Sequence, residues 1–203
     1  MKQEISISQK DALIIADIQK DFLPGGSLPV LSGEEVIPVL NDYIRLFKTA
    51  KAKIFATRDW HPPNHTSFKV FGGLWPPHCI QGTDGASFHP DLKLPESVKI
   101  ISKATDPKRE SYSGFDGTTL ADYLKKSEVS RIFVGGLTTD YCVRYTVLDG
   151  LALGFDVILL SDAIRGINPE SIATADTSLT KAEIRKKARL RSRGPYRRLK
   201  AER

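Results

Sequence analysis

Short apolar runs recur along the chain and alternate with longer segments in which apolar residues have helical spacing. The runs lie at 12–18, 54–58, 98–102, 132–135 and 156–160. Short apolar runs that alternate with helical patterns predict parallel strands in βαβ units, whose two faces are both covered. The pattern therefore predicts a doubly wound three-layer α/β sandwich with a mostly parallel central sheet.

The helical patterns are expected at 34–50, 118–126, 140–153 and 169–187. Val36, Leu40 and Ile44 have the spacing of one helix face, and Pro38 falls in a first turn, where proline is tolerated. Residues 60–97 are rich in Pro, Gly and His and show little periodicity. A loop that long within a compact domain is usually functional.

Length and composition indicate one soluble domain. The 203 residues suit a single core, which we place at 1–187, followed by a basic tail at 188–203. Two cysteines offer no disulfide framework, and the polar start lacks the apolar stretch of a signal peptide. We expect a cytoplasmic protein that does not enter a membrane.

The net charge of +6 is concentrated at the end of the chain. Residues 181–203 hold eleven Lys and Arg against two Glu, which leaves residues 1–180 with a net charge of −3. A basic tail can bind polyanions, but the body of the chain is not basic. Nucleic acid is therefore not the expected partner.

Reactive side chains stand at or just beyond the ends of four apolar runs. Asp17 lies near the end of the first, Asp59 and His61 follow the second, Lys103 follows the third, and Cys142 comes a few residues after the fourth. In parallel sheets, ligands bind beyond the carboxyl ends of the strands. The arrangement predicts an enzyme with an acid, a lysine, a thiol and metal ligands at one edge of its sheet.

Cys142 is the candidate nucleophile. It follows Gly135-Gly136, where a strand turns into a helix, so we expect it in the first helical turn, where N–H groups and the helix dipole favour a thiolate. Asp17 could take the thiol proton and later protonate a leaving amine. Lys103 would stabilise both anions. Taken singly, a buried structural cysteine, a turn aspartate and a surface lysine are the alternatives.

Asp59, His61 and His78 are the candidate metal ligands. In an extended segment Asp59 and His61 point to the same side, and His78 could complete the set from the long loop. One carboxylate and two imidazoles leave coordination positions open, as zinc and non-haem iron enzymes require. His65 is either a fourth ligand or a partner of a ligand, and Cys79 is either a ligand or a buried thiol.

Several segments together identify a family resemblance. From about residue 12 to 166 the chain resembles nicotinamidases, which also act on pyrazinamide, of the isochorismatase-like cysteine hydrolases. The segments are IADIQKDF at 15–22, RDWHP at 58–62, WPPHC at 75–79, Lys103 with YSGF at 112–115, TDYCV at 139–143 and SDA at 161–163. The WPPHC segment is similar to that of the metal-containing members.

The resemblance implies a role for each site residue. It implies a catalytic triad, an oxyanion hole from the N–H groups of Thr138 and Cys142 beside a cis peptide at Leu137–Thr138, two aromatic pocket walls and a metal site. The triad would be Asp17, Lys103 and Cys142; the walls Phe22 and Trp75; and the ligands Asp59, His61 and His78. Zinc is the expected ion, with iron or manganese as alternatives.

The implied reaction is the hydrolysis of nicotinamide to nicotinate and ammonia through a thioester, in NAD salvage. The metal would bind the pyridine nitrogen and orient the ring. Nicotinamide is the expected small-molecule partner, and a homo-oligomer is expected. The departure from the family is the polar segment 188–193, where relatives have a short apolar strand.

Two other classes of function stay open at this point. A carbamoyl-group hydrolase of the same fold would keep the triad without needing Asp59, His61 and His78, so metal analysis separates the two. A binding protein that acts through its tail would lose its activity on deletion from Arg189 onward.

Overall fold

The computed structural model describes residues 5–167 and 190–191, and a five-stranded parallel sheet forms its centre. The strand order is β4-β3-β2-β5-β6, so the chain winds outward in both directions from β2. The strands are β2 (Asp11–Ala16), β3 (Lys53–Asp59), β4 (Lys99–Lys103), β5 (Arg131–Leu137) and β6 (Asp156–Arg165). All four pairings between them are parallel, which confirms the predicted sheet.

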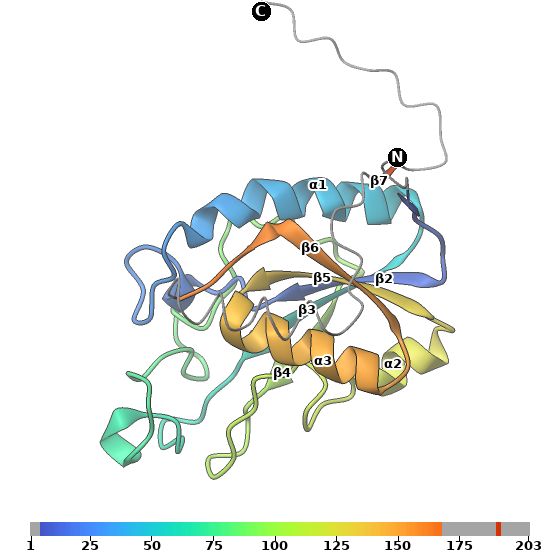
Figure 1. Ribbon diagram of the computed structural model, residues 1–203. Coiled ribbons are helices and arrows are strands. Elements are labelled where there is room, and N and C mark those ends of the chain that lie inside the picture. The colour runs from blue at the N-terminus through green and yellow to red at the C-terminus, as the bar shows by residue number, and fades with distance from the viewer. Residues whose placement is uncertain (1–4, 168–189, 192–203) are drawn as a thin grey trace, which may run out of the picture.

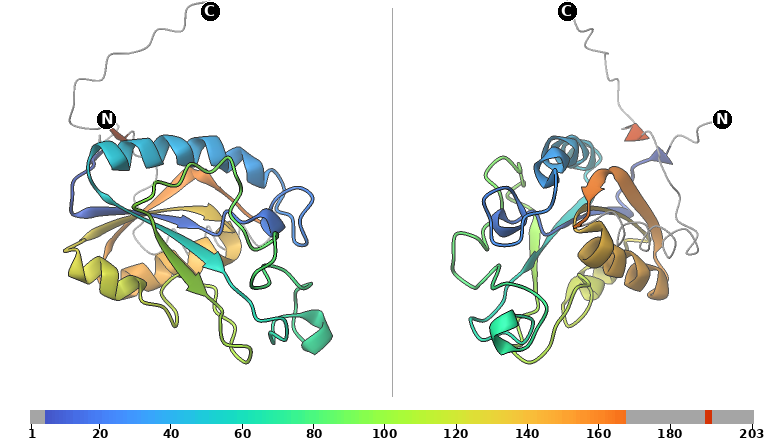
Figure 2. Two further views of the ribbon diagram at one scale, coloured as in Figure 1. Left: turned by 180° about the vertical axis from the view of Figure 1, so that it is seen from behind. Right: turned by 60° about the vertical axis from the view of Figure 1, so that its left-hand side comes forward.

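Helices cover both faces of this sheet (Figure 1). α1 (Val36–Thr49) lies on one face, and α2 (Leu120–Lys126) and α3 (Arg144–Ala152) lie on the other. Seen from behind, the same three layers appear, and the loop after β3 extends to one side of them (Figure 2). The predicted three-layer sandwich is confirmed, whereas the helix expected at 169–187 lies outside the described residues.

The two hydrophobic cores follow from the alternation of side chains along each strand. In β2, Leu13 and Ile15 face the α1 side, while Ala12 and Ile14 face α2 and α3. All four are fully buried. A strand covered on both faces therefore reads as a continuous apolar run, because polar residues would be buried on either side.

The ends of several elements differ from their predicted bounds. β6 continues to Arg165 because its pairing with β5 resumes at Gly136 after a register shift. The segment expected as helix 34–50 begins with a 3-10 turn at Gly33–Glu35, and α1 follows. Just before α2, the Thr118 hydroxyl accepts from the backbone N–H of Leu120.

A second, two-stranded sheet joins the start of the chain to the predicted tail. β1 (Ile5–Ser6) pairs in parallel with β7 (Leu190–Arg191). The segment expected to lack a strand thus contains a short one. The division of the chain at residue 187 stays a prediction.

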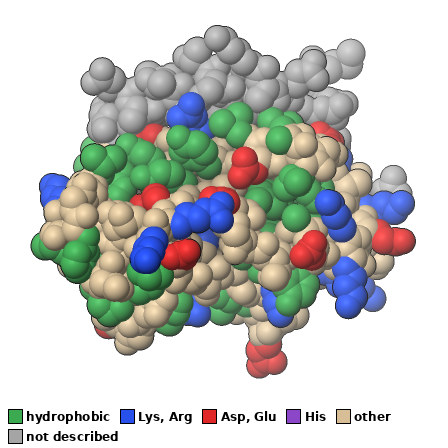
Figure 3. Space-filling view, turned by 90° about the horizontal axis from the view of Figure 1, so that it is seen from below, with side chains coloured by type: hydrophobic (Ala, Val, Ile, Leu, Met, Phe, Trp, Pro, Cys, Tyr) green, Lys and Arg blue, Asp and Glu red, His purple; other side chains and the backbone are tan. Residues whose placement is uncertain are grey.

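One face of the molecule carries a mixed surface. Lys and Arg side chains there are interspersed with Asp and Glu, and hydrophobic side chains lie between them (Figure 3). None of the helices in the described part of the chain has the length and apolar content to cross a bilayer.

Candidate active site

The carboxyl ends of β2, β3, β4 and β5 bring the predicted reactive residues together. Asp59 and Lys103 are paired in register at the ends of β3 and β4. Asp17 follows β2 directly, with a positive φ of 49° that turns the chain out of the sheet. Cys142 follows β5 on the segment that leads into α3. The structure thus places one acid, one lysine and one thiol at a single edge, as the strand pattern predicts.

Lys103 lies at the centre of this cluster. Its side chain is fully buried, and its Nζ lies 3.1 Å from Asp17 Oδ2. The same Nζ lies 3.3 Å from Cys142 Sγ and forms a closer ion pair with Asp59. Three acidic groups therefore share one ammonium. A buried charge is costly unless it is paired, so each member of the cluster depends on the others.

Asp17 is held so that one of its oxygens remains available. The Thr57 hydroxyl donates to Asp17 Oδ1 at 2.6 Å. Asp17 Oδ2 has no well-aligned hydrogen bond among the described residues, although Lys103 Nζ is near it. Asp17, Asp59 and Cys142 have acidic atoms within 4.8 Å of one another. An open lone pair near the thiol suits Asp17 to accept a proton from Cys142.

The local structure at Cys142 differs from the predicted first turn of an α-helix. Residues Thr139–Val143 form a π-helical turn, and the α-helix begins only at Arg144. Burial raises the pKa of the Cys142 thiol well above its ordinary value, although the Lys103 ammonium acts in the opposite direction. The burial of the thiol therefore opposes the thiolate expected from the sequence, whereas the Lys103 ammonium favours it.

The pKa values of Asp17 and Lys103 suit the transfer of a proton to Asp17. Burial raises the pKa of Asp17 despite the opposing Lys103 charge, which makes its carboxylate a stronger base than an exposed aspartate. Burial lowers the pKa of Lys103, but the surrounding Asp17, Asp59 and Cys142 outweigh it and raise the value. The raised pKa favours the protonated form of Lys103 beside these acidic groups.

The three predicted metal ligands also meet. Donor atoms of Asp59, His61 and His78 lie within 4.8 Å of one another, and all three residues are buried. His61 Nδ1 lies 3.0 Å from the carbonyl of His78, and His78 Nδ1 lies 2.8 Å from the carbonyl of Pro76. A carbonyl only accepts, so each Nδ1 carries the hydrogen, and in the neutral imidazole each Nε2 then keeps its lone pair. Two free imidazole nitrogens beside a carboxylate fit a divalent metal ion.

Buried side chains fix the backbone of this metal-binding segment. The Gln19 amide donates to the carbonyls of Asp59 (2.8 Å) and Ala86 (3.0 Å), and its oxygen accepts from the Asp59 N–H at 2.7 Å. Asp21 Oδ2 accepts from the N–H of Cys79 at 2.7 Å. A side chain on Gly85 would collide with this carboxylate, since an added Cβ would lie 2.3 Å from Asp21 Oδ2.

His65 and Cys79 make contacts of their own beside the three candidate ligands. His65 Nε2 lies 3.1 Å from the carbonyl of Arg109, and Nδ1 lies 2.7 Å from the hydroxyl of Ser67. Both ring nitrogens are thus occupied, and His65 instead packs with its ring centre 4.5 Å from that of His61. Cys79 is fully buried, and burial raises its pKa well above the ordinary value, as for an inert thiol.

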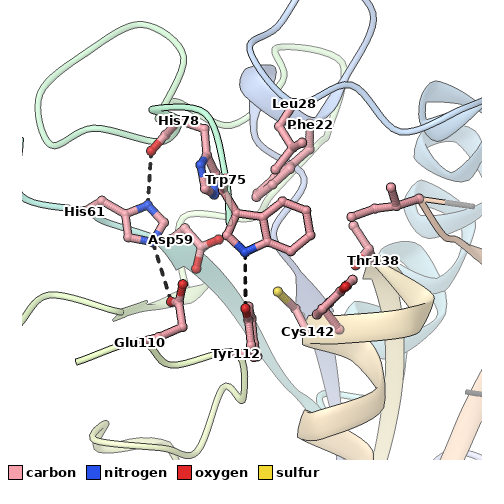
Figure 4. Close-up of a pocket in the computed structure, with 12 residues that line it drawn as sticks. Phe22, Leu28, Asp59, His61, Trp75, His78, Glu110, Tyr112, Thr138 and Cys142 are labelled. Atoms are coloured by element: carbon pink, nitrogen blue, oxygen red, sulfur yellow. Dashed lines mark hydrogen bonds and ion pairs between the residues drawn. The ribbon is translucent and has the colours of Figure 1, made fainter. Parts of the chain in front are cut away.

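A pocket connects the thiol to the three metal-binding side chains. Cys142 lies at one side of it, and Asp59, His61 and His78 lie at another (Figure 4). The two predicted aromatic walls, Phe22 and Trp75, both line this pocket. Phe22 meets the His78 ring edge-on at 5.5 Å, and the Trp75 indole N–H donates to the Tyr112 hydroxyl at 3.1 Å. Aromatic side chains of this kind commonly line pockets that bind flat aromatic molecules.

Several lining residues were not singled out from the sequence: Leu28, Glu110, Tyr112, Tyr141 and Ile167. Tyr112 belongs to a segment that carries the resemblance, but its spacing gives no sign of a contact with Trp75. Glu110 stands just before that segment, on the loop after the Lys103 strand, where any carboxylate is a candidate for the site.

Thr138 lines the pocket with an unsatisfied hydroxyl. Within the described residues, Thr138 Oγ1 is buried without a hydrogen-bond partner. The peptide between Leu137 and Thr138 is cis, as the resemblance implies. The roles of the Thr138 and Cys142 N–H groups as an oxyanion hole remain predictions. A buried hydroxyl without a partner in a pocket is a group that a bound molecule could satisfy.

Comparison with known proteins assigns the fold and site to a family. An isochorismatase domain model matches residues 11–185. The nicotinamidase of Escherichia coli is 36% identical over 84% of this chain and 91% of its own length. The chain belongs to the isochorismatase family. Family membership and these relatives make it an amide hydrolase.

Two solved structures of isochorismatase-type enzymes resemble the fold closely. The pyrazinamidase of Pyrococcus horikoshii, solved in complex with zinc, has a TM-score of 0.85 and 51% identity, and covers 88% of this chain and 99% of that one. A protein from L. infantum in complex with nicotinate has a TM-score of 0.86 and 35% identity, over 94% and 100%. The zinc complex of the first structure, together with the donor atoms of Asp59, His61 and His78, supports a divalent metal ion in this chain.

Proposed function

We propose that this chain hydrolyses nicotinamide to nicotinate and ammonia, as a step of NAD salvage, and that it accepts pyrazinamide as well. The observation that carries the proposal is a buried thiol–lysine–aspartate cluster and a three-donor metal set on one aromatic-walled pocket. The first supplies a nucleophile for a carboxamide carbon, and the second supplies a site for a ring nitrogen.

The reaction begins with proton transfer from Cys142 to Asp17. As the sulfur forms a bond to the carboxamide carbon, Asp17 Oδ2 accepts the thiol proton, and the Lys103 ammonium, 3.3 Å from the sulfur, stabilises the developing anion. Asp17 then gives this proton to the nitrogen, the C–N bond breaks, and ammonia leaves. The Thr138 and Cys142 N–H groups would hold the oxygen of the tetrahedral intermediate.

Hydrolysis of the thioester restores the site. Asp17 takes a proton from water as the water oxygen attacks the acyl carbon, and the C–S bond breaks. The proton returns to the sulfur, and the carboxylic acid leaves and loses its own proton to ammonia or solvent, which gives nicotinate. Asp17 therefore acts as base and acid in turn, which its raised pKa favours.

We assign the metal site to zinc, with Asp59, His61 and His78 as the ligands. Such an ion supplies Lewis-acid attraction for the pyridine nitrogen. Phe22 and Trp75 limit the ring to one plane, and this orientation would present the carboxamide to Cys142. The ready lone pairs of His61 and His78 favour this proposal over a carbamoyl-group hydrolase, which would need the triad alone.

Ammonia release from nicotinamide tests the proposed function, with benzamide as the matched substrate. Benzamide has the same amide but lacks the ring nitrogen. We expect rapid ammonia release from nicotinamide, a very low rate with benzamide, and one equivalent of zinc in the purified protein. Equal rates with the two amides would contradict the orienting role of the metal.

A further inference from the structure

Glu110 is a second carboxylate at the metal-binding end of the pocket. It lines the pocket and lies on the loop after β4, and its side chain is 26% exposed. The backbone N–H of Ser111 donates to Glu110 Oε1 at 2.9 Å, which fixes the carboxylate next to its own backbone. In Figure 4 the side chain points toward the imidazole of His61.

The partner of Glu110 is the imidazole nitrogen that is free for a metal. Glu110 Oε1 lies 3.9 Å from His61 Nε2, while His61 Nδ1 is directed to the His78 carbonyl. Two donors bound to one zinc ion at about 2.0–2.2 Å lie roughly 3.0–3.5 Å apart when they are adjacent. Donor atoms of Glu110, His61 and His65 lie within 4.8 Å of one another, and those of Asp59, His61 and His78 form a separate group of the same kind. Glu110 is therefore close to the metal set without belonging to it.

The charges around the metal-binding residues indicate an electrostatic role for Glu110. The Asp59 carboxylate is already paired with the Lys103 ammonium, so its charge is partly offset before any cation binds. Glu110 has no ion pair with a lysine or arginine within residues 5–167, and the neighbouring Arg109 pairs with Asp116 instead. Among the described residues, no lysine or arginine therefore neutralises the negative charge of Glu110, and the basic group that faces it is the imidazole of His61.

We propose that Glu110 is a positioning residue of the metal site, which raises its affinity for a divalent cation without ligating it. This inference rests on the proposed function, because it assumes the Asp59, His61 and His78 site. The carboxylate attracts the ion electrostatically and fixes the loop that faces His61. Partners just outside the ligands commonly change metal affinity by about 10- to 100-fold.

The test compares zinc affinity in three proteins: wild type, Glu110→Gln and Asp116→Asn. Glutamine has the same shape and its oxygen can still accept from the Ser111 N–H, so only the charge is lost. Asp116→Asn removes a carboxylate from the same loop outside the pocket and is the control. Each zinc-loaded protein is titrated with a chromophoric chelator, which reports its zinc dissociation constant.

We expect Glu110→Gln to weaken zinc binding at least tenfold, and Asp116→Asn to change it by less than threefold. Wild-type affinity in Glu110→Gln would overturn the inference, as would equal losses in the two variants, since a general effect of the loop would then explain them. Failure of wild type itself to bind zinc would instead overturn the metal site of the proposed function.

Cobalt substitution tests the placement outside the ligands. The visible d–d bands of bound Co²⁺ depend on the number and type of ligands. We expect wild type and Glu110→Gln to show the same band positions and intensities when saturated with cobalt. Different bands would make Glu110 a ligand and overturn its assignment as a positioning residue.

Discussion

The two halves of the candidate site are held in place by different means. The triad of Asp17, Lys103 and Cys142 stands at the ends of parallel strands, and its members are held by their mutual charges. The metal set lies partly on the loop after β3, where Gln19 and Asp21 anchor the backbone through buried hydrogen bonds. One half depends on electrostatic balance, and the other on buried hydrogen bonds to the main chain.

This difference predicts how each half of the site responds to substitution of its residues. Loss of charge in the triad should leave an unpaired buried ion, which affects stability as well as chemistry. Loss of an anchor in the loop should displace ligands while the triad remains intact. The variants below separate these effects, beginning with the largest.

Replacement of Cys142 by alanine should abolish turnover by at least about 10⁴-fold, or roughly 5 kcal/mol of transition-state stabilisation. The change removes the nucleophile and leaves the charged side chains of Asp17, Asp59 and Lys103 in place. The measurement is the steady-state rate of ammonia release, with zinc content as the control. Retention of more than a small fraction of the wild-type rate would exclude a covalent thioester.

Replacement of Lys103 by methionine should destabilise the fold by about 3–5 kcal/mol, since Asp17 and Asp59 would lose their shared cation. Chemical denaturation of wild type and variant measures this loss. The double variant Lys103→Met/Asp17→Asn should recover part of it, because one buried carboxylate is then neutral. A single variant as stable as wild type would show that the cluster is not held by charge.

Replacement of Gln19 by leucine should cost about 2–3 kcal/mol of stability, because three buried backbone groups lose their partner. It should also weaken zinc binding about tenfold or more, since one of those groups is the Asp59 N–H. Gln81→Leu is the matched control: Gln81 also donates to a backbone carbonyl, that of Trp60, but at an exposed site. Similar losses in both variants would argue against a specific anchor.

Replacement of Thr138 by valine should lower kcat/KM for nicotinamide about tenfold, or roughly 1.4 kcal/mol. Its hydroxyl has no partner in the described part of the chain, so stability should change little. Thr138→Ser keeps the hydroxyl and should retain most of the activity. If valine and serine gave the same kcat/KM, the hydroxyl would have no contact with substrate.

The sequence predicts the strand-end half of the site better than the loop half. Apolar runs mark β2 to β6 because both faces of the sheet are buried, and the polar residue after each run then lies at the same edge. The end of β6 could not be predicted, since it depends on a register shift opposite Gly136. β1 and β7, with two residues each, are too short to show any period.

The contacts of the loop half arise from tertiary structure. Nothing in the spacing of Gln19 indicates that its amide bonds to Asp59, forty residues away. The π-helical turn at Cys142 and the approach of Glu110 to His61 likewise depend on how distant segments meet. The predicted ligands came from residue types and the family resemblance, whereas the contacts of His65 with Ser67 and Arg109 are visible only in the structure.

The single ammonium of Lys103 has a further consequence for turnover. In each step of the proposed reaction a proton moves among sulfur, carboxylate and the reacting molecule, so the total charge around Lys103 would stay constant. An electrically balanced cycle needs no counterion to enter or leave a buried site. The chemical steps should therefore be insensitive to ionic strength, because no charge is separated across the protein interior as the acyl group is transferred.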